Sequence, residues 1–401
     1  MRNMSNKSAE AGKTGLIVRG LTAGAACAFI LATSLASAAP TAAQRDQARR
    51  IYDRIAGVPP SPTELDTLAN LMESSGPEAV ALEATKAPSF YSVVLKNFVT
   101  PWTNRDQTVF APLNDYTATV IGMVRDDKPF NTVLSSNILY TLKTGGLPAP
   151  SATGNEHYED AETRGVDLKA DLVESNQTAV YGTPDAGTAG LLTTRAASAA
   201  FFIDGTNRAM FRFTMINHMC RDMEQLADTS RPPDRIRQDV SRSPGGDSRI
   251  FLNNCIGCHS GMDPMAQAFA YYDFDDTQKK LVYTPGVVNE KYFINSDNFK
   301  PGFITPNDSW ENRWRVGHNS LLGFSGGLPG KGTGAKSLGE EIANSDAFAV
   351  CQVEKAFKAV CFRAPSDAAD RSAVSAAVSH FKAGYNLRQA FAETAAYCAT
   401  H

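Results

Sequence analysis

The 401-residue sequence has little of several features that define common protein classes. Its formal charge is only −3, so no cationic excess favours nucleic acid or an anionic membrane as a partner. Beyond the first 38 residues, no apolar run approaches the length needed to cross a membrane. Histidine is scarce, Cys-x-x-Cys-His occurs once, and no methionine follows Met265. The chain therefore does not have the sequence of a dihaem protein or of an integral membrane protein.

The first 38 residues have the pattern of a secretory signal. Four basic residues precede the apolar run LTAGAACAFILATSL, and Ala36-Ser37-Ala38 follows as a small-x-small cleavage site. We expect cleavage after Ala38 and a protein that is periplasmic or otherwise exported, with no integral membrane segment after cleavage. In an oxidising compartment, cysteines outside a cofactor site tend to form disulfides.

The rest of the chain has mostly helical periodicity. Residues 43–57 place apolar side chains on one face, and Ser61, Pro62 and Glu64 form a capping box at the start of the next segment. The fold class is predicted to be mainly α. Residues 279–295, with β-branched and aromatic side chains around a Pro-Gly pair, predict a small β-hairpin.

The segment FLNNCIGCHSGMDPMAQAFAYYDFD contains the chemical signature of a covalent haem site. Thiols three residues apart, Cys255 and Cys258, match the two vinyl groups of a haem, and the adjacent His259 then reaches the iron as proximal ligand. Two other interpretations are a thioredoxin-like redox pair and half of a zinc site. The first lacks a βαβ pattern around it, and the second lacks a matching Cys/His pair downstream. We therefore expect one covalent haem c.

This segment resembles the haem segment of large exported cytochrome c-like proteins first noticed in planctomycetes. The matching residues are Cys255, Cys258, His259, Asp263, Pro264, Phe274 and Asp275. Ala266 departs from the glycine that family members often carry after Asp-Pro. The resemblance extends more weakly to N-terminal and C-terminal helical modules, and it implies an exported c-type haem protein without specifying a substrate.

The domain prediction combines these patterns. It consists of a signal peptide (1–38), an all-α N-terminal module (41–142), an irregular connection (143–190), a cytochrome c-like haem module (191–335) and a C-terminal helical module with the character of a bundle (336–401). Ser337 and Glu340 predict a capping box near the start of the last module.

The sixth iron ligand decides between electron transfer and ligand chemistry. His318, 59 residues downstream of His259, is the first candidate, Met219 or Met215 the next, and a vacant site the third. Arg313 and Arg315 are candidates for pairing with haem propionates, against the alternative of surface ion pairs. Asp263 is expected to shape a turn with Pro264, with a proton-donor role as the alternative.

Four cysteines remain once two are assigned to the haem. The last three predicted helices run up, down and up, which places Cys361 and Cys398 at the same end of the bundle. We therefore favour a Cys361–Cys398 disulfide, which leaves Cys220 to pair with Cys351; free buried thiols are the alternative. Each bridge would stabilise the fold by roughly 3–4 kcal/mol.

These observations predict an exported monohaem cytochrome that carries electrons to or from an unknown redox partner protein. The alternatives are a haem-dependent enzyme of peroxidase or oxygenase type with an open distal site, and a haem-bearing module of a surface assembly. A lone catalytic haem needs nearby acid or base groups, and the sequence identifies none.

Overall fold

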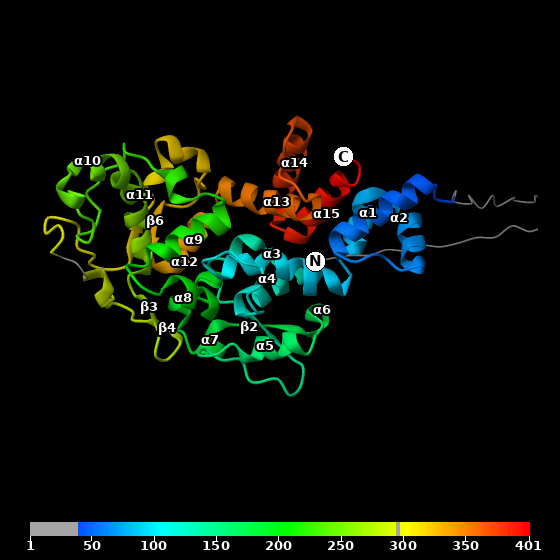
Figure 1. Cartoon of the computed structure of the whole chain (residues 1–401), viewed down its shortest axis with the longest axis horizontal. Helices are drawn as coiled ribbons and strands as arrows, with labels where there is room; N and C mark the ends of the chain where they lie inside the picture. The colour runs from blue at the N-terminus through cyan, green and yellow to red at the C-terminus, as the bar shows by residue number, and fades with distance from the viewer. Residues whose placement is uncertain (1–38, 294–296) are drawn as a thin grey trace, which may run out of the picture. The chain divides into compact units, whose positions relative to one another are not determined.

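The computed structural model describes residues 39–293 and 297–401, and this part of the chain is mainly helical (Figure 1). The predicted signal peptide lies outside the described residues. Across the described ranges, no helix combines the length and apolarity that a bilayer crossing requires. The helices are α1 (Ala42–Ala56), α2 (Pro62–Ala84), α3 (Lys96–Val99), α4 (Asp115–Arg125), α5 (Glu156–Thr163), α6 (Leu168–Asp171), α7 (Gln177–Tyr181), α8 (Arg195–Phe201), α9 (Arg208–Met219), α10 (Ser248–Ile250), α11 (Ile256–Ala266), α12 (Gly334–Ala343), α13 (Asp346–Cys361), α14 (Ala368–Gly384) and α15 (Leu387–Cys398).

The N-terminal hairpin forms as its local signals predict. The predicted apolar face of α1 is buried, and the helix ends at Gly57, which takes the left-handed conformation. The capping box of Ser61 and Glu64 begins α2. Gly76 has non-helical angles (φ 82°, ψ −178°), so a kink divides α2 immediately before Pro77.

Three two-stranded antiparallel sheets interrupt the helices in the described residues. The strands are β1 (Leu139–Leu142), β2 (Leu172–Ser175), β3 (Tyr272–Asp275), β4 (Lys280–Tyr283), β5 (Ser309–Glu311) and β6 (Lys331–Thr333). The prediction that residues 41–142 are all α was wrong at its end, because β1 pairs with β2 about thirty residues later. The connection 143–190, expected to be mostly irregular with a short helix or two, contains the three short helices α5, α6 and α7 and also the strand β2, which was not expected. Every residue of β1 is buried, so the strand lacks the polar–apolar alternation that would reveal it.

A β-hairpin forms near the predicted place, but its turn lies earlier. β3 pairs with β4 in the register Tyr272 to Tyr283, and the chain reverses between Asp275 and Lys280. The Pro285-Gly286 pair does form a turn, closed by Val287 N–H donating to Thr284 O, but this turn follows the hairpin, so the prediction that the hairpin centres on Pro-Gly was wrong. Lys279 provides the left-handed residue of the turn with φ 54°, a conformation that its sequence does not suggest.

The predicted modules share one core. Residues 39–401 form one compact unit, and buried apolar residues from all regions belong to one hydrophobic cluster. The C-terminal helix α15 packs on α13, α14 and also α2, which brings the last helix against the N-terminal hairpin (Figure 1). The predicted capping box at Ser337 does not form. Ser337 lies inside α12, where its hydroxyl bonds to Thr333 O and accepts from Trp310 Nε1.

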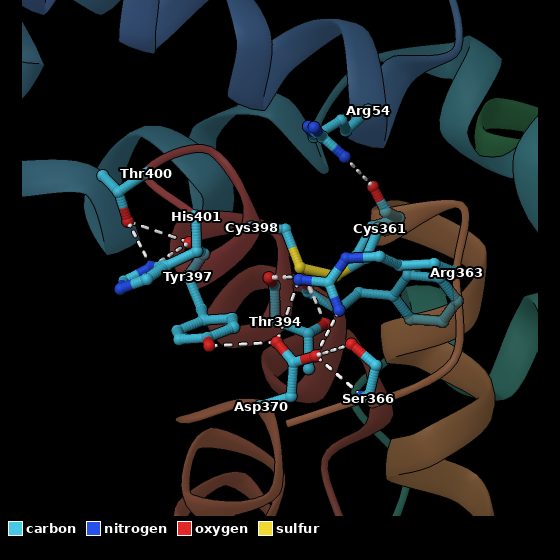
Figure 2. Close-up of a disulfide and its surroundings, with 12 residues drawn as sticks. Arg54, Cys361, Arg363, Ser366, Asp370, Thr394, Tyr397, Cys398, Thr400 and His401 are labelled. Atoms are coloured by element: carbon cyan, nitrogen blue, oxygen red, sulfur yellow. Dashed lines mark hydrogen bonds and ion pairs between the residues drawn. A yellow bond between two sulfur atoms is a disulfide. The ribbon is translucent and has the colours of Figure 1, made fainter. Parts of the chain in front are cut away.

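The structure pairs the four remaining cysteines as the helix arrangement suggested. Cys361 and Cys398, at the ends of α13 and α15, have Cα atoms 5.5 Å apart, and Cys220 and Cys351 have Cα atoms 5.3 Å apart. Figure 2 shows the Cys361–Cys398 bridge beside the ion pair of Arg363 and Asp370.

Replacing Cys361 and Cys398 by alanine is expected to lower the free energy of unfolding by about 4 kcal/mol. The reason is that the bridge closes a segment of 37 residues and so restricts the unfolded chain. Urea denaturation of the oxidised proteins measures the difference. Addition of reductant should remove most of it, and equal midpoints for the two oxidised proteins would show that the thiols are not joined.

Candidate functional site

Cys255, Cys258 and His259 lie at the start of α11. A π-helical turn over residues 251–255 leads into the helix, so Cys255 is the residue before its first turn. Among the described cysteines, only Cys255 and Cys258 are unpaired, and both are half-buried. Burial raises the pKa of the Cys258 thiol. A raised pKa is the opposite of what a reactive redox cysteine requires.

His259 makes a specific contact on its inner ring nitrogen. Its Nδ1 lies 3.2 Å and 3.3 Å from the carboxylate oxygens of Asp263, one helical turn later. An Nδ1–H that donates to a carboxylate leaves Nε2 as the lone-pair nitrogen. This carboxylate–histidine arrangement orients metal-binding imidazoles in many proteins and makes them stronger donors.

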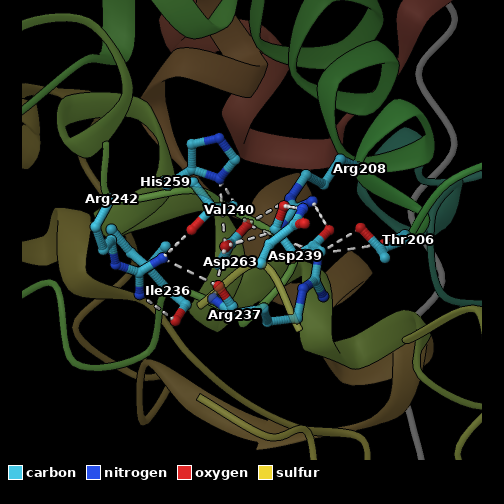
Figure 3. A network of polar contacts seen from close by, with 10 residues as sticks. Thr206, Arg208, Ile236, Arg237, Asp239, Val240, Arg242, His259 and Asp263 are labelled. Atoms are coloured by element: carbon cyan, nitrogen blue, oxygen red, sulfur yellow. Dashed lines mark hydrogen bonds and ion pairs between the residues drawn. The ribbon is translucent and has the colours of Figure 1, made fainter. Parts of the chain in front are cut away.

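The Asp263 carboxylate is fully buried and lies among cations, as Figure 3 shows. Arg208 donates to both of its oxygens, at 2.7 Å and 2.9 Å, and the backbone N–H of Arg237 donates at 3.3 Å. Arg208 also pairs with Asp239. Burial opposes ionisation of Asp263, but Arg208, Arg237 and His259 hold the pKa of this carboxyl well below its usual range.

Asp263 and Pro264 therefore do not have the predicted role. Both lie inside α11 rather than in a turn after it. An ionised carboxylate that accepts from two arginines is a poor proton donor, so the structure favours neither of the roles expected from sequence. The partners of Asp263 come from α9 and from the loop after residue 230, and no sequence pattern pointed to them.

A cavity of about 490 Å³ lies beside His259. This volume falls within the roughly 300–1,000 Å³ of typical ligand pockets. The wall combines cationic and apolar side chains: Arg105, Arg208, Ala209, Arg212, Phe213, Met223, His259 and Met262. The cavity can therefore receive a flat apolar group that carries carboxylates at its edge. The three arginines were not singled out in the sequence because their spacing along the chain is irregular.

The structure does not bring the predicted sixth ligands to this cavity. His318 and Met219 line a different hollow of about 300 Å³, beside the Cys220–Cys351 bridge. His318 Nδ1 lies 3.7 Å from Asp228, whose backbone N–H donates to Gly257 O within the Cys-x-x-Cys segment, and Asn319 Nδ2 donates to Leu226 O. These contacts hold the His318 loop beside the start of α11, but His318 does not line the cavity with His259.

Met215, the other methionine predicted as a sixth ligand, and the neighbouring His218 and Met223 lie in different surroundings. Met215 is buried in the core, and His218 Nε2 lies 3.0 Å from the Tyr116 hydroxyl in a buried contact. Met223 and Met262 do line the cavity with His259. Met262 lies three residues after His259 on the same helix and so stays on the same side of a haem bound by His259, which leaves Met223 as the thioether group to test as sixth ligand.

Arg313 and Arg315 are engaged with carboxylates. Arg313 pairs with Asp234, and Arg315 makes a two-pronged contact with Glu341 at 2.7 Å to each oxygen. Neither lines the cavity beside His259. The structure thus favours the ion-pair interpretation. Of the arginines that line the cavity, Arg208 pairs with Asp263 and Asp239 and Arg212 pairs with Asp222, whereas Arg105 donates only to backbone carbonyls within the described residues, so Arg105 is the candidate to bind a propionate.

No family model, curated protein or solved structure matches this chain. Within the described ranges, no group of three or more His, Cys, Asp or Glu side chains converges as a metal site would require. The candidate site is therefore defined by its own geometry: two unpaired thiols, one oriented imidazole and a cationic cavity.

Gly261 allows a close approach between α11 and a buried tryptophan. A Cβ atom at Gly261 would lie 2.0 Å from Trp314 Nε1, and Trp314 is fully buried. We expect Gly261→Ala to lower the free energy of unfolding by about 1–3 kcal/mol through overpacking, measured by urea denaturation. Gly384→Ala is the matched control, because a Cβ there meets nothing within 4 Å. Equal effects of both changes would contradict the close packing.

Proposed function

We propose that this chain is an exported c-type cytochrome that holds one haem on Cys255, Cys258 and His259 and transfers electrons with a redox partner protein. The observation that carries the proposal is the selective pairing of cysteines. Four of the described cysteines lie in two disulfide-distance pairs, and the two that remain unpaired are those of Cys-x-x-Cys-His. Their resemblance to the planctomycete-type haem segment supports the same assignment.

Each residue of the site then has a distinct task. The thiols of Cys255 and Cys258 tether the porphyrin, and His259 presents Nε2 to the iron because Asp263 occupies its Nδ1 side. Arg105, which pairs with no carboxylate among the described residues, supplies positive charge for a propionate in the cavity. A bound haem supplies an iron that changes between the ferric and ferrous states.

One observation favours the alternative of a haem-dependent enzyme. The buried Asp263 carboxylate at His259 Nδ1 makes Nε2 a stronger electron-pair donor to a metal. The predicted ligands His318 and Met219 line another hollow. A strong proximal donor with no sixth protein ligand suits reactions in which a small molecule binds the iron. Met223 as sixth ligand would instead favour electron transfer.

An absorption spectrum distinguishes the two functions. The full chain is co-expressed with c-type haem maturation proteins, purified, reduced and exposed to carbon monoxide. We expect a c-type reduced spectrum that carbon monoxide does not change, and Met223→Leu should then create carbon monoxide binding. A spectrum that shifts strongly in the unmodified protein would support the enzyme. A protein that contains no haem after co-expression would contradict both.

A further inference from the structure

A second cavity, larger than the one beside His259, lies between the N-terminal hairpin and α13. It has a volume of about 700 Å³, within the range of ligand pockets. Apolar side chains make up much of its lining. Val94, Phe98 and Trp102 come from residues 90–103, and Phe362 directly follows α13. Phe362 is 76% exposed and has a left-handed backbone (φ 58°). The guanidinium carbon of Arg54 lies 5.6 Å from the centre of the Phe362 ring, and most of this aromatic side chain stays exposed at the edge of the cavity.

The cavity also contains a lysine with no counter-ion. Lys355 Nζ lies 3.2 Å above the centre of the Trp102 ring and donates to Asn217 O at 2.6 Å. Across the described residues, no carboxylate lies within ion-pair distance of this ammonium, and burial alone lowers its pKa well below the usual range. A desolvated ammonium without an anion is costly, and an anionic ligand would remove that cost.

The rest of the cavity wall is also cationic. Arg54 and Lys358 line it, and Arg54 donates to a backbone carbonyl, Val360 O, rather than to a carboxylate. Asp53 is the one acidic side chain of the lining, and burial raises its pKa. Positive charge therefore exceeds negative charge around an apolar floor.

We propose that this cavity binds an amphipathic monocarboxylate, a molecule with an alkyl or aryl body and one anionic head. The body would lie against Phe98, Trp102 and Phe362, and the head would pair with Lys355. The proposal is independent of the haem, because none of the residues that line this cavity also lines the one beside His259.

Isothermal titration of the full exported chain with octanoate tests the proposal, with 1-octanol as the neutral analogue. We expect octanoate to bind at least about tenfold more tightly than octanol. Lys355→Met should weaken octanoate binding about tenfold or more and leave octanol binding nearly unchanged. Lys382→Met is the matched control, because Lys382, on α14, already pairs with Asp346 of α13 and lies outside the cavity; it should change neither ligand's affinity.

Two further measurements keep the test decisive if Lys355→Met does not fold. Lys358→Glu changes an exposed residue of the wall and should weaken octanoate several-fold. In the unmodified protein, octanoate binding should draw a proton from the buffer, because an anion stabilises the charged form of Lys355; the heat of binding then depends on the ionisation heat of the buffer. Equal affinity for octanol and octanoate, no binding of either, or binding without proton uptake and unaffected by Lys358→Glu would overturn the proposal.

Discussion

Replacing Cys255 and Cys258 together by alanine is expected to reduce covalently attached haem from one per chain to none. Without both thiols, His259 is the only group of the motif that could still hold the cofactor, and a single imidazole bond does not survive denaturation. Haem staining of denaturing gels and the mass of the denatured chain measure the attachment. Each single replacement should retain a covalent haem through the remaining thioether, in reduced yield.

The matched control removes the same number of thiols elsewhere. The Cys361→Ala/Cys398→Ala protein should be less stable but should keep its covalent haem, because that bridge is remote in sequence from the motif and lies at the end of the helices α13 and α15. Loss of haem in both double variants would indicate that misfolding, rather than loss of the thioether thiols, prevents attachment. Haem that stays covalently bound without Cys255 and Cys258 would contradict the assigned site.

Asp263→Asn is expected to lower the free energy of unfolding by about 3–5 kcal/mol. The change removes a carboxylate that is fully buried and leaves Arg208 and Arg237 as neighbouring cations with only Asp239 to balance them (Figure 3). Removing one member of a buried charge network costs far more than the net contribution of the network, because the remaining charge stays desolvated. Urea denaturation measures the loss.

Two companion variants test whether the loss of stability comes from the unpaired buried charge. Asp276→Asn disrupts an exposed pair with Lys279 and should produce no measurable change. Asp263→Asn combined with Arg208→Met should recover part of the lost stability, because the unpaired cation is removed as well. An Asp263→Asn protein as stable as the unmodified chain would contradict the network.

The reduction potential of the Asp263→Asn protein is a second measurement, which would not change if Asp263 only supported the fold. In protein that carries the proposed haem, Asp263→Asn should raise the reduction potential. The ionised carboxylate on His259 Nδ1 favours the ferric iron through the imidazole, and a neutral amide removes that preference. An unchanged potential would mean that Asp263 supports the fold without influencing the iron ligand.

Features that depend on residues a few positions apart could be predicted from the sequence. The capping box of Ser61 and Glu64 forms because both partners lie within one helical turn, and the spacing of Cys255, Cys258 and His259 is visible in the sequence itself. The pairing of Cys361 with Cys398 followed from short helix connections, which allow few arrangements. Local geometry determines such contacts almost independently of the rest of the fold.

Contacts between distant segments were decided only by packing. β1 was not predicted because its four residues are all buried, which removes the polar–apolar alternation of a strand, and because its partner β2 lies in a distant part of the sequence. Arg208 meets Asp263 across 55 residues, and His318 lies near Asp228 and does not line the cavity beside His259. A charged or imidazole side chain carries no sequence signal for which distant partner it will meet. That choice depends on how the whole core fills its volume and on which buried charges can be neutralised together.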